Sequence, residues 1–148
     1  MLDLFAGTGA MGLEALSRGA ERALFVDQSS AAVRVIRTNI ELCGAGAAAR
    51  IIHGTAPAAV KALAQRGERF DLVFMDPPYG KGLIDKTIGL LDGITGEDSL
   101  VVAEHHVKDV CAPRCGRWIK TGERRYGDAL VSFYGREVLP DQATTPGS

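Results

Sequence analysis

The sequence contains few of the features that mark membrane, secreted or disulfide-stabilised proteins. Its three cysteines form no even set of pairs, so they predict no disulfide framework. No apolar run approaches the ~20 residues of a membrane span, and no basic and apolar leader opens the chain. We therefore expect a cytoplasmic protein with no membrane partner.

Neither sign of charge is in large excess, and aromatic residues make up only 6% of the chain. The net charge of −1 does not indicate binding to nucleic acid. The local distribution differs, because six basic residues but only two acidic ones lie between Lys108 and Arg125, a local charge of +4. Such a stretch suits a phosphate-facing patch and the solvated face of a hairpin equally well, and the sequence leaves both interpretations open.

The order of apolar runs predicts the fold class. The 148 residues are enough for one domain around a single core. The expected strands are 2–5, 23–26, 50–52, 70–75, 99–104, 118–122 and 130–134, and the expected helices are 11–18, 29–42, 57–65 and 83–91. This alternation predicts an α/β fold with a parallel, doubly wound sheet and an antiparallel end. We predict a domain at 1–137 and a flexible tail at 138–148.

A glycine-rich loop follows the first expected strand. Gly7-Thr8-Gly9-Ala10-Met11-Gly12 has the G-x-G-x-x-G spacing and opens a helix, which is the context of a nucleotide-type loop. Asp27 ends the second expected strand, where its carboxylate can accept two ribose hydroxyl protons. The two features fit either NAD or S-adenosylmethionine. Asp3 favours the second, because its carboxylate suits a cationic amino group and would repel a pyrophosphate.

The run Asp76-Pro77-Pro78-Tyr79 is the most informative motif of the chain. It follows an apolar strand, and its two prolines prevent further ladder pairing and stiffen the strand exit. It presents a carboxylate, a carbonyl oxygen and an aromatic ring together. These groups can accept two N–H bonds and stack on a ring, so they suit a planar group that carries an amine.

Together these motifs resemble the class I S-adenosylmethionine-dependent methyltransferases that act on exocyclic amines. More narrowly, the stretch 2–20 (LDLFAGTGAMGLEALSRGA) is similar to the RsmD-type 16S rRNA guanine-N2 methyltransferases. So are 74–79 followed by Gly82-Leu83, the strand end 102–104, and Tyr126-Gly127 with Phe133-Tyr134. The resemblance runs from about Leu2 to Arg136. That family carries an upstream segment with an Arg-Pro-Thr motif, which this sequence lacks, so we expect a chain shortened at its N-terminus.

The resemblance implies a three-layer Rossmann-like fold with a mostly parallel seven-stranded sheet and an antiparallel closing strand. It also implies methylation of the N2 amine of a guanine in 16S rRNA, of the guanine-966 type, in the small ribosomal subunit. The implied cofactor is S-adenosyl-L-methionine, without a metal, and a monomer is favoured. Thr55, or a backbone N–H near it, would replace the acid that many relatives have near the adenine.

The candidate site residues form three sets. The catalytic set is Asp76, Pro77 and Tyr79. The cofactor set is Asp3, Phe5, Gly7, Gly9, Asp27, Gln28, Thr55, Ala56 and Asp76. The substrate set is Pro78, Tyr79, Arg124, Arg125 and Tyr126.

Other interpretations remain open from the sequence. The same tetrapeptide serves adenine-N6 methylation of DNA or RNA. An NAD-binding oxidoreductase would explain the glycine loop and Asp27 but not the tetrapeptide, and a shortened chain could bind cofactor or RNA without catalysis. Cys111 and Cys115, near His105 and His106, do not have the spacing of a zinc knuckle. His53 is expected to form a hydrogen bond at a strand end, and Glu104 to border the site.

Overall fold

The apolar runs form one mixed sheet in the computed structural model, which describes residues 1–138. The strands are β1 (Leu2–Leu4), β2 (Ala23–Asp27), β3 (Ala49–His53), β4 (Phe70–Met75), β5 (Thr95–His106), β6 (Arg114–Cys115), β7 (Trp118–Tyr126) and β8 (Ala129–Arg136). Their order across the sheet is β3-β2-β1-β4-β5-β8-β7-β6. The strands from β3 to β5 are parallel, whereas β8, β7 and β6 pair antiparallel.

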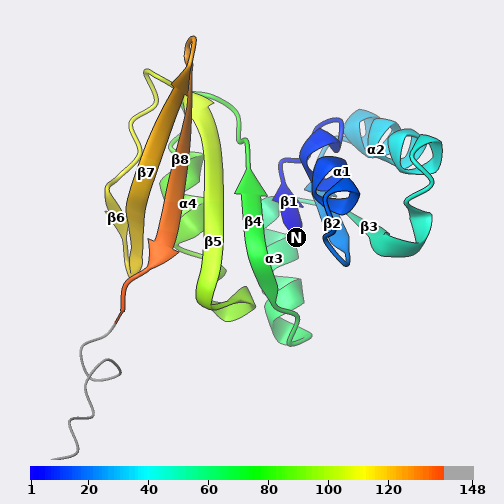
Figure 1. Ribbon diagram of the computed structural model, residues 1–148, viewed down its shortest axis with the longest axis horizontal. Coiled ribbons are helices and arrows are strands. Elements are labelled where there is room, and N and C mark those ends of the chain that lie inside the picture. The colour runs from blue at the N-terminus through cyan, green and yellow to red at the C-terminus, as the bar shows by residue number, and fades with distance from the viewer. Residues whose placement is uncertain (139–148) are drawn as a thin grey trace, which may run out of the picture.

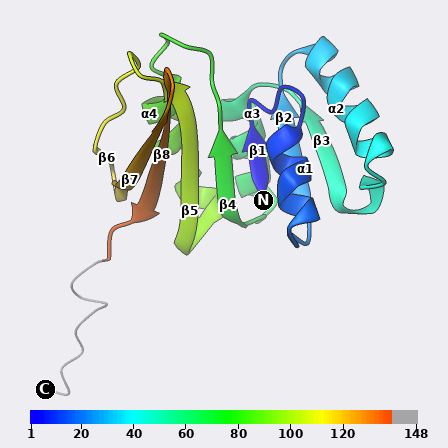
Figure 2. The same ribbon diagram turned by 45° about the horizontal axis from the view of Figure 1, so that its top comes forward.

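Helices cover both faces of the sheet, and two of them begin with a side-chain cap. The helices are α1 (Ala10–Ser17), α2 (Ser30–Leu42), α3 (Ala56–Gln65) and α4 (Leu83–Ile88), with 3-10 turns at Gly46–Ala48 and Leu91–Ile94. The Ser29 hydroxyl accepts from the Ala32 N–H at 3.2 Å, and the Thr55 hydroxyl accepts from the Ala58 N–H at 3.3 Å. Helices α1 and α2 lie on one face, and α3 and α4 lie on the other (Figures 1 and 2).

Two apolar clusters hold these layers together. The larger one lies under α3 and α4 and includes Leu63, Met75 and Ile88, all fully buried. The smaller one joins α1 and α2 to β2 through Phe25 and Ile36, which have no exposed surface. Because successive strand residues point to opposite faces, β2 supplies Leu24 and Val26 to the first cluster and Phe25 to the second.

The predicted fold class is confirmed, and the differences concern the edges of elements. The fifth predicted strand, 99–104, is longer in the structure, since β5 runs from Thr95 to His106. The expected helix 83–91 ends at Ile88 and is followed by the 3-10 turn Leu91–Ile94. The expected seven strands become eight because the two-residue strand β6 adds to the edge beside β7. The predicted tail falls mostly on residues 139–148, which lie outside the described residues.

The strand order places a crevice at the carboxyl ends of the central strands. Strand β1 pairs with β2 on one side and with β4 on the other, so the chain changes direction across the sheet at β1. Ligands of open α/β sheets bind outside the carboxyl ends of the strands at such a switch point. The glycine loop, Asp27 and the Asp76–Tyr79 segment all lie where strands end there.

Replacing Gly12 with alanine should destabilise the fold, because this glycine lets α1 approach β2. A Cβ at Gly12 would lie 2.3 Å from Cε1 of Phe25, whose side chain is fully buried. We expect Gly12→Ala to lower the free energy of unfolding by about 1–3 kcal/mol, measured by urea denaturation. Gly46→Ala is the matched control, since no atom lies within 4 Å of its Cβ position; equal stability of the two variants would contradict this packing.

Candidate active site

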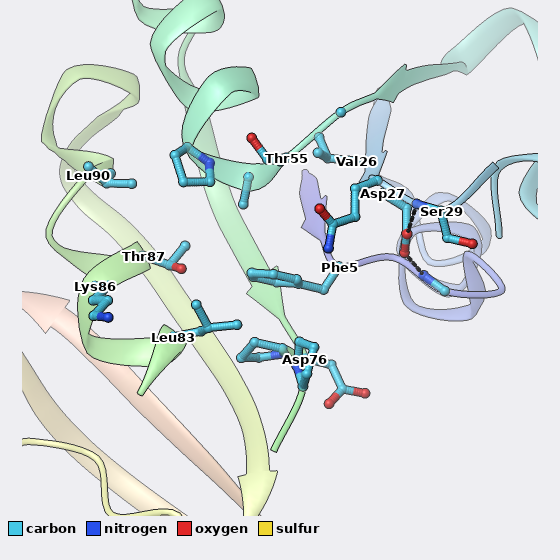
Figure 3. A pocket seen from close by; sticks show the side chains of 17 residues that line it. Phe5, Val26, Asp27, Ser29, Thr55, Asp76, Leu83, Lys86, Thr87 and Leu90 are labelled. Carbon is cyan, nitrogen blue, oxygen red and sulfur yellow. Dashed lines mark hydrogen bonds between the residues drawn. The ribbon is translucent and has the colours of Figure 1, made fainter. Parts of the chain in front are cut away.

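The glycine loop is tied to the end of β2 by the Asp27 carboxylate. Its two oxygens accept the N–H of Gly7 and the N–H of Ser29, each at 2.9 Å (Figure 3). The loop turns through Gly7 and Gly9, whose φ angles are 60° and 80°, in the region that favours glycine. A carboxylate can accept about four hydrogen bonds. Asp27 can therefore hold the loop and still accept hydrogen bonds from a ligand.

Asp3 lies behind this loop and not in the cleft. Its side chain is 1% exposed, and its Oδ2 accepts the N–H of Gly12 at 3.1 Å. Burial raises the pKa of Asp3 to about 7, and the negative charges of Asp76 and Asp27 act in the same direction. The Gly12 hydrogen bond opposes this shift. Asp3 therefore anchors the first turn of α1 from below.

A cavity of about 810 Å³ opens in front of the glycine loop and is called the first cavity here. Its lining comes from the ends of β1, β2, β3 and β4 and from α4, and includes Phe5, Gly7, Asp27, Gln28, Thr55, Ala56, Asp76, Pro77 and Pro78. Phe5 lies in its middle, with Thr55 and Asp27 on one side and Leu83 on the other (Figure 3). Phe5 has a φ of 58°, an uncommon conformation for a bulky side chain that often marks functional sites.

A second cavity of about 450 Å³ lies on the other side of the Asp-Pro-Pro-Tyr segment. It is lined by Asp76, Pro77, Tyr79, Glu104, His105, His106, Tyr126, Asp128 and Ala129. Asp76 and Pro77 line both cavities and so form the wall between them. A group bound in one cavity can thus meet a group bound in the other at this wall.

The wall carries a second carboxylate beside Asp76. Met75 pairs with Ala103 across the parallel strands, so the next residues, Asp76 and Glu104, lie side by side on the same face. Loss of water around its carboxylate raises the pKa of Asp76, and the charge of Glu104 raises it further. At the mouth, Tyr79 is 57% exposed, and its ring centre lies 4.9 Å from that of His106.

The loop after β5 holds the Asp-Pro-Pro-Tyr segment in place. The N–H of Gly80 donates to Oδ2 of Asp109 at 3.1 Å. Asp109 is itself fixed, because its carbonyl oxygen lies 2.9 Å from Nδ1 of the buried His105. His105 Nε2 in turn lies 2.8 Å from the Ser132 hydroxyl on β8. The position of Tyr79 therefore depends on the antiparallel end of the sheet.

The structure brings together most, but not all, of the predicted site residues. The first cavity collects seven of the nine predicted cofactor residues: Phe5, Gly7, Asp27, Gln28, Thr55, Ala56 and Asp76. Asp3 and Gly9 do not line it. Of the predicted substrate residues, Tyr79 and Tyr126 line the second cavity and Pro78 lines the first, whereas Arg124 and Arg125 line neither. The Arg125 guanidinium donates instead to the carbonyl of Gly127 at 2.8 Å.

One smaller expectation, the strand-end hydrogen bond of His53, can be compared with the geometry. His53 forms the expected strand-end hydrogen bond, with its Nε2 at 3.1 Å from the carbonyl oxygen of Gln28. The Cys115 thiol lies 3.7 Å from the Asp85 carboxylate. Within residues 1–138, no three His, Cys, Asp or Glu side chains gather as metal ligands would. No helix in this part of the chain is long and apolar enough to cross a membrane.

Sequence reasoning missed the contribution of α4 and of His106, whereas Glu104, expected to border the site, lines the second cavity. Leu83, Thr87 and Leu90 line the first cavity, and Lys86 lies among them. Leu83 and Thr87 lie one turn apart on α4, and Leu90 follows the end of this helix by two residues. Their spacing of four and three residues within the expected helix 83–91 is the signal that could have found them. His106 follows Glu104 by two residues and so points to the same face of β5, which is the signal that could have placed it in the second cavity.

Comparisons with known proteins give consistent relatives. The family model described as conserved hypothetical protein 95 matches residues 1–135. Ribosomal RNA small subunit methyltransferase D of Escherichia coli (strain K12) is 35% identical over 139 residues, which cover 93% of this chain and 68% of that protein. YlbH of Bacillus subtilis (strain 168) is 34% identical over 135 residues, 90% of this chain and 73% of that protein. A conserved hypothetical protein of Streptococcus pyogenes has a solved structure with a TM-score of 0.84 at 34% identity, covering 92% of this chain and 84% of that one.

Replacing Asp3 with asparagine should stabilise the protein in a pH-dependent way. The pKa of Asp3 is about 7 in the fold against an ordinary 3.8, so between these values the folded state holds the extra proton and loses stability as the pH rises. The amide of the variant would not titrate, and its oxygen could still accept from Gly12. We expect the melting temperatures of Asp3→Asn and wild type to differ little at pH 4 and to diverge in favour of the variant by pH 8. If the melting temperatures of Asp3→Asn and wild type differ by the same amount at pH 4 and pH 8, Asp3 does not carry a buried, uncompensated charge at high pH.

Proposed function

The chain belongs to the conserved hypothetical protein 95 family, the RsmD/YlbH family of class I S-adenosylmethionine-dependent methyltransferases, and from that premise we propose that it methylates the exocyclic N2 amine of a guanine in 16S rRNA. The observation that carries the proposal is the wall of Asp76 and Pro77 between two cavities. One cavity suits the methyl donor and the other a base. We take residues 1–137 as the methyltransferase domain.

The first cavity fits S-adenosyl-L-methionine in size and in its polar groups. Its volume of about 810 Å³ lies within the ~300–1,000 Å³ range of ligand pockets. Asp27 would accept the ribose hydroxyls from the end of β2, with Gln28 beside it. Phe5, Pro57 and Leu90 provide apolar surface for the adenine, and Thr55 or the backbone near Ala56 would contact its edge. When bound, the cofactor supplies a methyl group activated by a sulfonium charge.

Asp3 and Gly9 would support this site without touching the ligand. A Cβ at Gly9 would lie 3.3 Å from Cε1 of Phe25, so the glycine keeps the loop close to the sheet. Asp3 holds the first turn of α1 through Gly12. Since the ionised form of Asp3 is disfavoured by burial, a cationic group bound near the loop would favour its ionisation.

The second cavity would hold the base that is methylated. An aromatic amine is a weak nucleophile because its lone pair is delocalised into the ring. The Asp76 carboxylate and the Pro77 carbonyl would accept its two N–H bonds and turn the lone pair toward the first cavity. Tyr79 would stack on the base after the base leaves its own stack in the RNA, and Tyr126 also lines this cavity. Asp76 is the group placed to take the proton that the amine releases.

The RNA backbone would lie along the β7–β8 hairpin. Arg124 and Arg125 are exposed on β7 just before Tyr126, which borders the second cavity and is 61% exposed. Exposed cations that precede a cavity-lining residue suit the phosphates that flank a bound base. The Escherichia coli relative is named for the small-subunit RNA, which supports 16S rRNA and the small ribosomal subunit as the partner.

S-adenosylhomocysteine should bind to this chain with an affinity that depends on Asp27. We expect Asp27→Ala to weaken binding at least ~10-fold, because the variant loses a charged hydrogen-bond acceptor and releases the Gly7 and Ser29 N–H groups. The measurement is calorimetric titration, with NAD run in parallel. Asp71→Ala is the matched control, since Asp71 is exposed on β4 outside both cavities. Binding of NAD in place of S-adenosylhomocysteine would contradict the proposed cofactor.

Methyl transfer should depend on the ionised Asp76. With tritiated S-adenosylmethionine and small-subunit rRNA that lacks the modification, we expect Asp76→Asn to lower kcat by about 100-fold or more, the usual size of a general-base contribution. The pKa of Asp76 is raised, so wild-type activity should fall on acidification at a pH above the ~4 of ordinary aspartate. Retention of the wild-type kcat by Asp76→Asn would exclude this role for the carboxylate.

A further inference from the structure

Glu104 is a carboxylate in the second cavity that the proposed chemistry does not use. It is half-buried at the end of β5 and lies beside Asp76 on the same face of the sheet. Among residues 1–138, no hydrogen bond or ion pair engages its oxygens. Glu104 lines the second cavity, so its carboxylate oxygens are placed to accept hydrogen bonds from N–H groups of a bound ligand.

His106 contributes a donor to the same cavity, two residues further along β5. Its Nδ1 accepts the backbone N–H of Lys108 at 3.0 Å. A backbone N–H can only donate, so the proton of the neutral imidazole must be on Nε2. The ring lies against Tyr79, with 4.9 Å between ring centres, and lines the cavity. No described residue accepts from its Nε2–H, which leaves this donor for a ligand.

We propose that Glu104 and His106 read the base, with Glu104 accepting the N1–H of guanine and the Nε2–H of His106 donating to its O6. The inference rests on the proposed function. The Watson–Crick edge of guanine presents two donors and then an acceptor: N2–H, N1–H and O6. The second cavity offers a complementary set, since the register places the acceptor Glu104 beside the acceptor Asp76 and the donor His106 follows Glu104 by two residues on β5. Flipped bases are commonly read on this edge.

The same series rejects adenine. Adenine carries its amine beside N1, which is an acceptor and has no proton. With that amine on Asp76, the lone pair of N1 would face the Glu104 carboxylate, and both groups would be left without a partner. A site built to pair a substrate N–H rejects an analogue that lacks it far more strongly than a shape mismatch does. The tetrapeptide alone accepts either base, so Glu104 is the residue that separates guanine from adenine.

A base analogue tests this directly. The wild-type full chain first methylates small-subunit rRNA, and mass spectrometry locates the modified nucleotide. RNA is then ligated with guanine or 2-aminopurine at that nucleotide. 2-Aminopurine keeps the exocyclic amine but has an acceptor at N1 and no O6. We expect wild type to prefer guanine in kcat/KM by about 100-fold or more, in the range for an unpaired charged group.

Glu104→Gln should reduce that preference at least ~10-fold, since the amide can turn its NH2 group toward N1 of 2-aminopurine. His106→Phe keeps an aromatic ring beside Tyr79 and should lower use of guanine about 10-fold relative to use of 2-aminopurine, because the loss of the Lys108 N–H acceptor affects both bases alike. Asp98→Asn is the matched control, because Asp98 is an exposed carboxylate at the opposite end of β5. Glu104→Gln should also bind S-adenosylhomocysteine as wild type does, because Glu104 does not line the first cavity.

The outcomes separate this inference from the proposed function. If wild type transfers methyl groups to guanine and Glu104→Gln keeps the wild-type ratio of guanine to 2-aminopurine, the reading role of Glu104 is wrong and the function stands. Glu104→Gln could instead shift the pH profile of kcat/KM equally for guanine and 2-aminopurine. That result would mean that Glu104 acts only through the charge it places beside Asp76, and it would overturn the reading role. If wild type transfers no methyl group to guanine in any small-subunit rRNA, the proposed function itself fails.

Discussion

Four carboxylates gather near the carboxyl ends of the central strands, because the register of the parallel strands places them at neighbouring levels on one face of the sheet. Asp3 lies on β1, Asp27 ends β2, Asp76 follows β4 and Glu104 lies near the end of β5. Asp27, Asp76 and Glu104 each follow a residue at the level of Leu4, and Asp3 precedes Leu4, so these side chains approach one another across a few strand spacings. Like charges at such distances oppose folding, and the rest of the site can be understood as the means by which each charge is accommodated.

Each carboxylate is accommodated differently, and the difference defines its use. Asp3 is covered by α1 and has a pKa of about 7, so it needs no counter-charge when it is protonated. Asp27 accepts two backbone N–H groups and thereby shapes the glycine loop. Asp76 and Glu104 face an open cavity without such partners among the described residues. Asp3 and Asp27 thus have hydrogen-bond partners within the fold. Under the proposed function, Asp76 and Glu104 would find theirs in the N–H donors of a bound base.

The sequence predicted the parts of the site that depend on neighbours along the chain. The Gly7–Gly12 loop, Asp27 at a strand end and the Asp76–Tyr79 turn are each local patterns whose backbone geometry follows from glycine, strand termination or proline. It failed where the outcome depends on packing between distant segments. The burial of Asp3 is set by how closely α1 packs on the sheet, and the lining from α4 by how that helix meets the strand ends. The strand β6 is only two residues long and forms because β7 offers it an edge.

The same distinction explains why the tetrapeptide identifies the chemistry but not the base. Asp76, Pro77 and Tyr79 would contact an amine and the face of a ring, and these features are common to guanine and adenine. The atom that differs, N1, lies beside the amine and so would face the neighbouring strand. The pairing of Met75 with Ala103 decides which β5 residue stands there, and a shift of the register by one residue would replace Glu104 with a side chain from the opposite face. Under the proposed role of Glu104, specificity for the base is a property of the β4–β5 register, and the Asp-Pro-Pro-Tyr turn provides only the reactive end of the site.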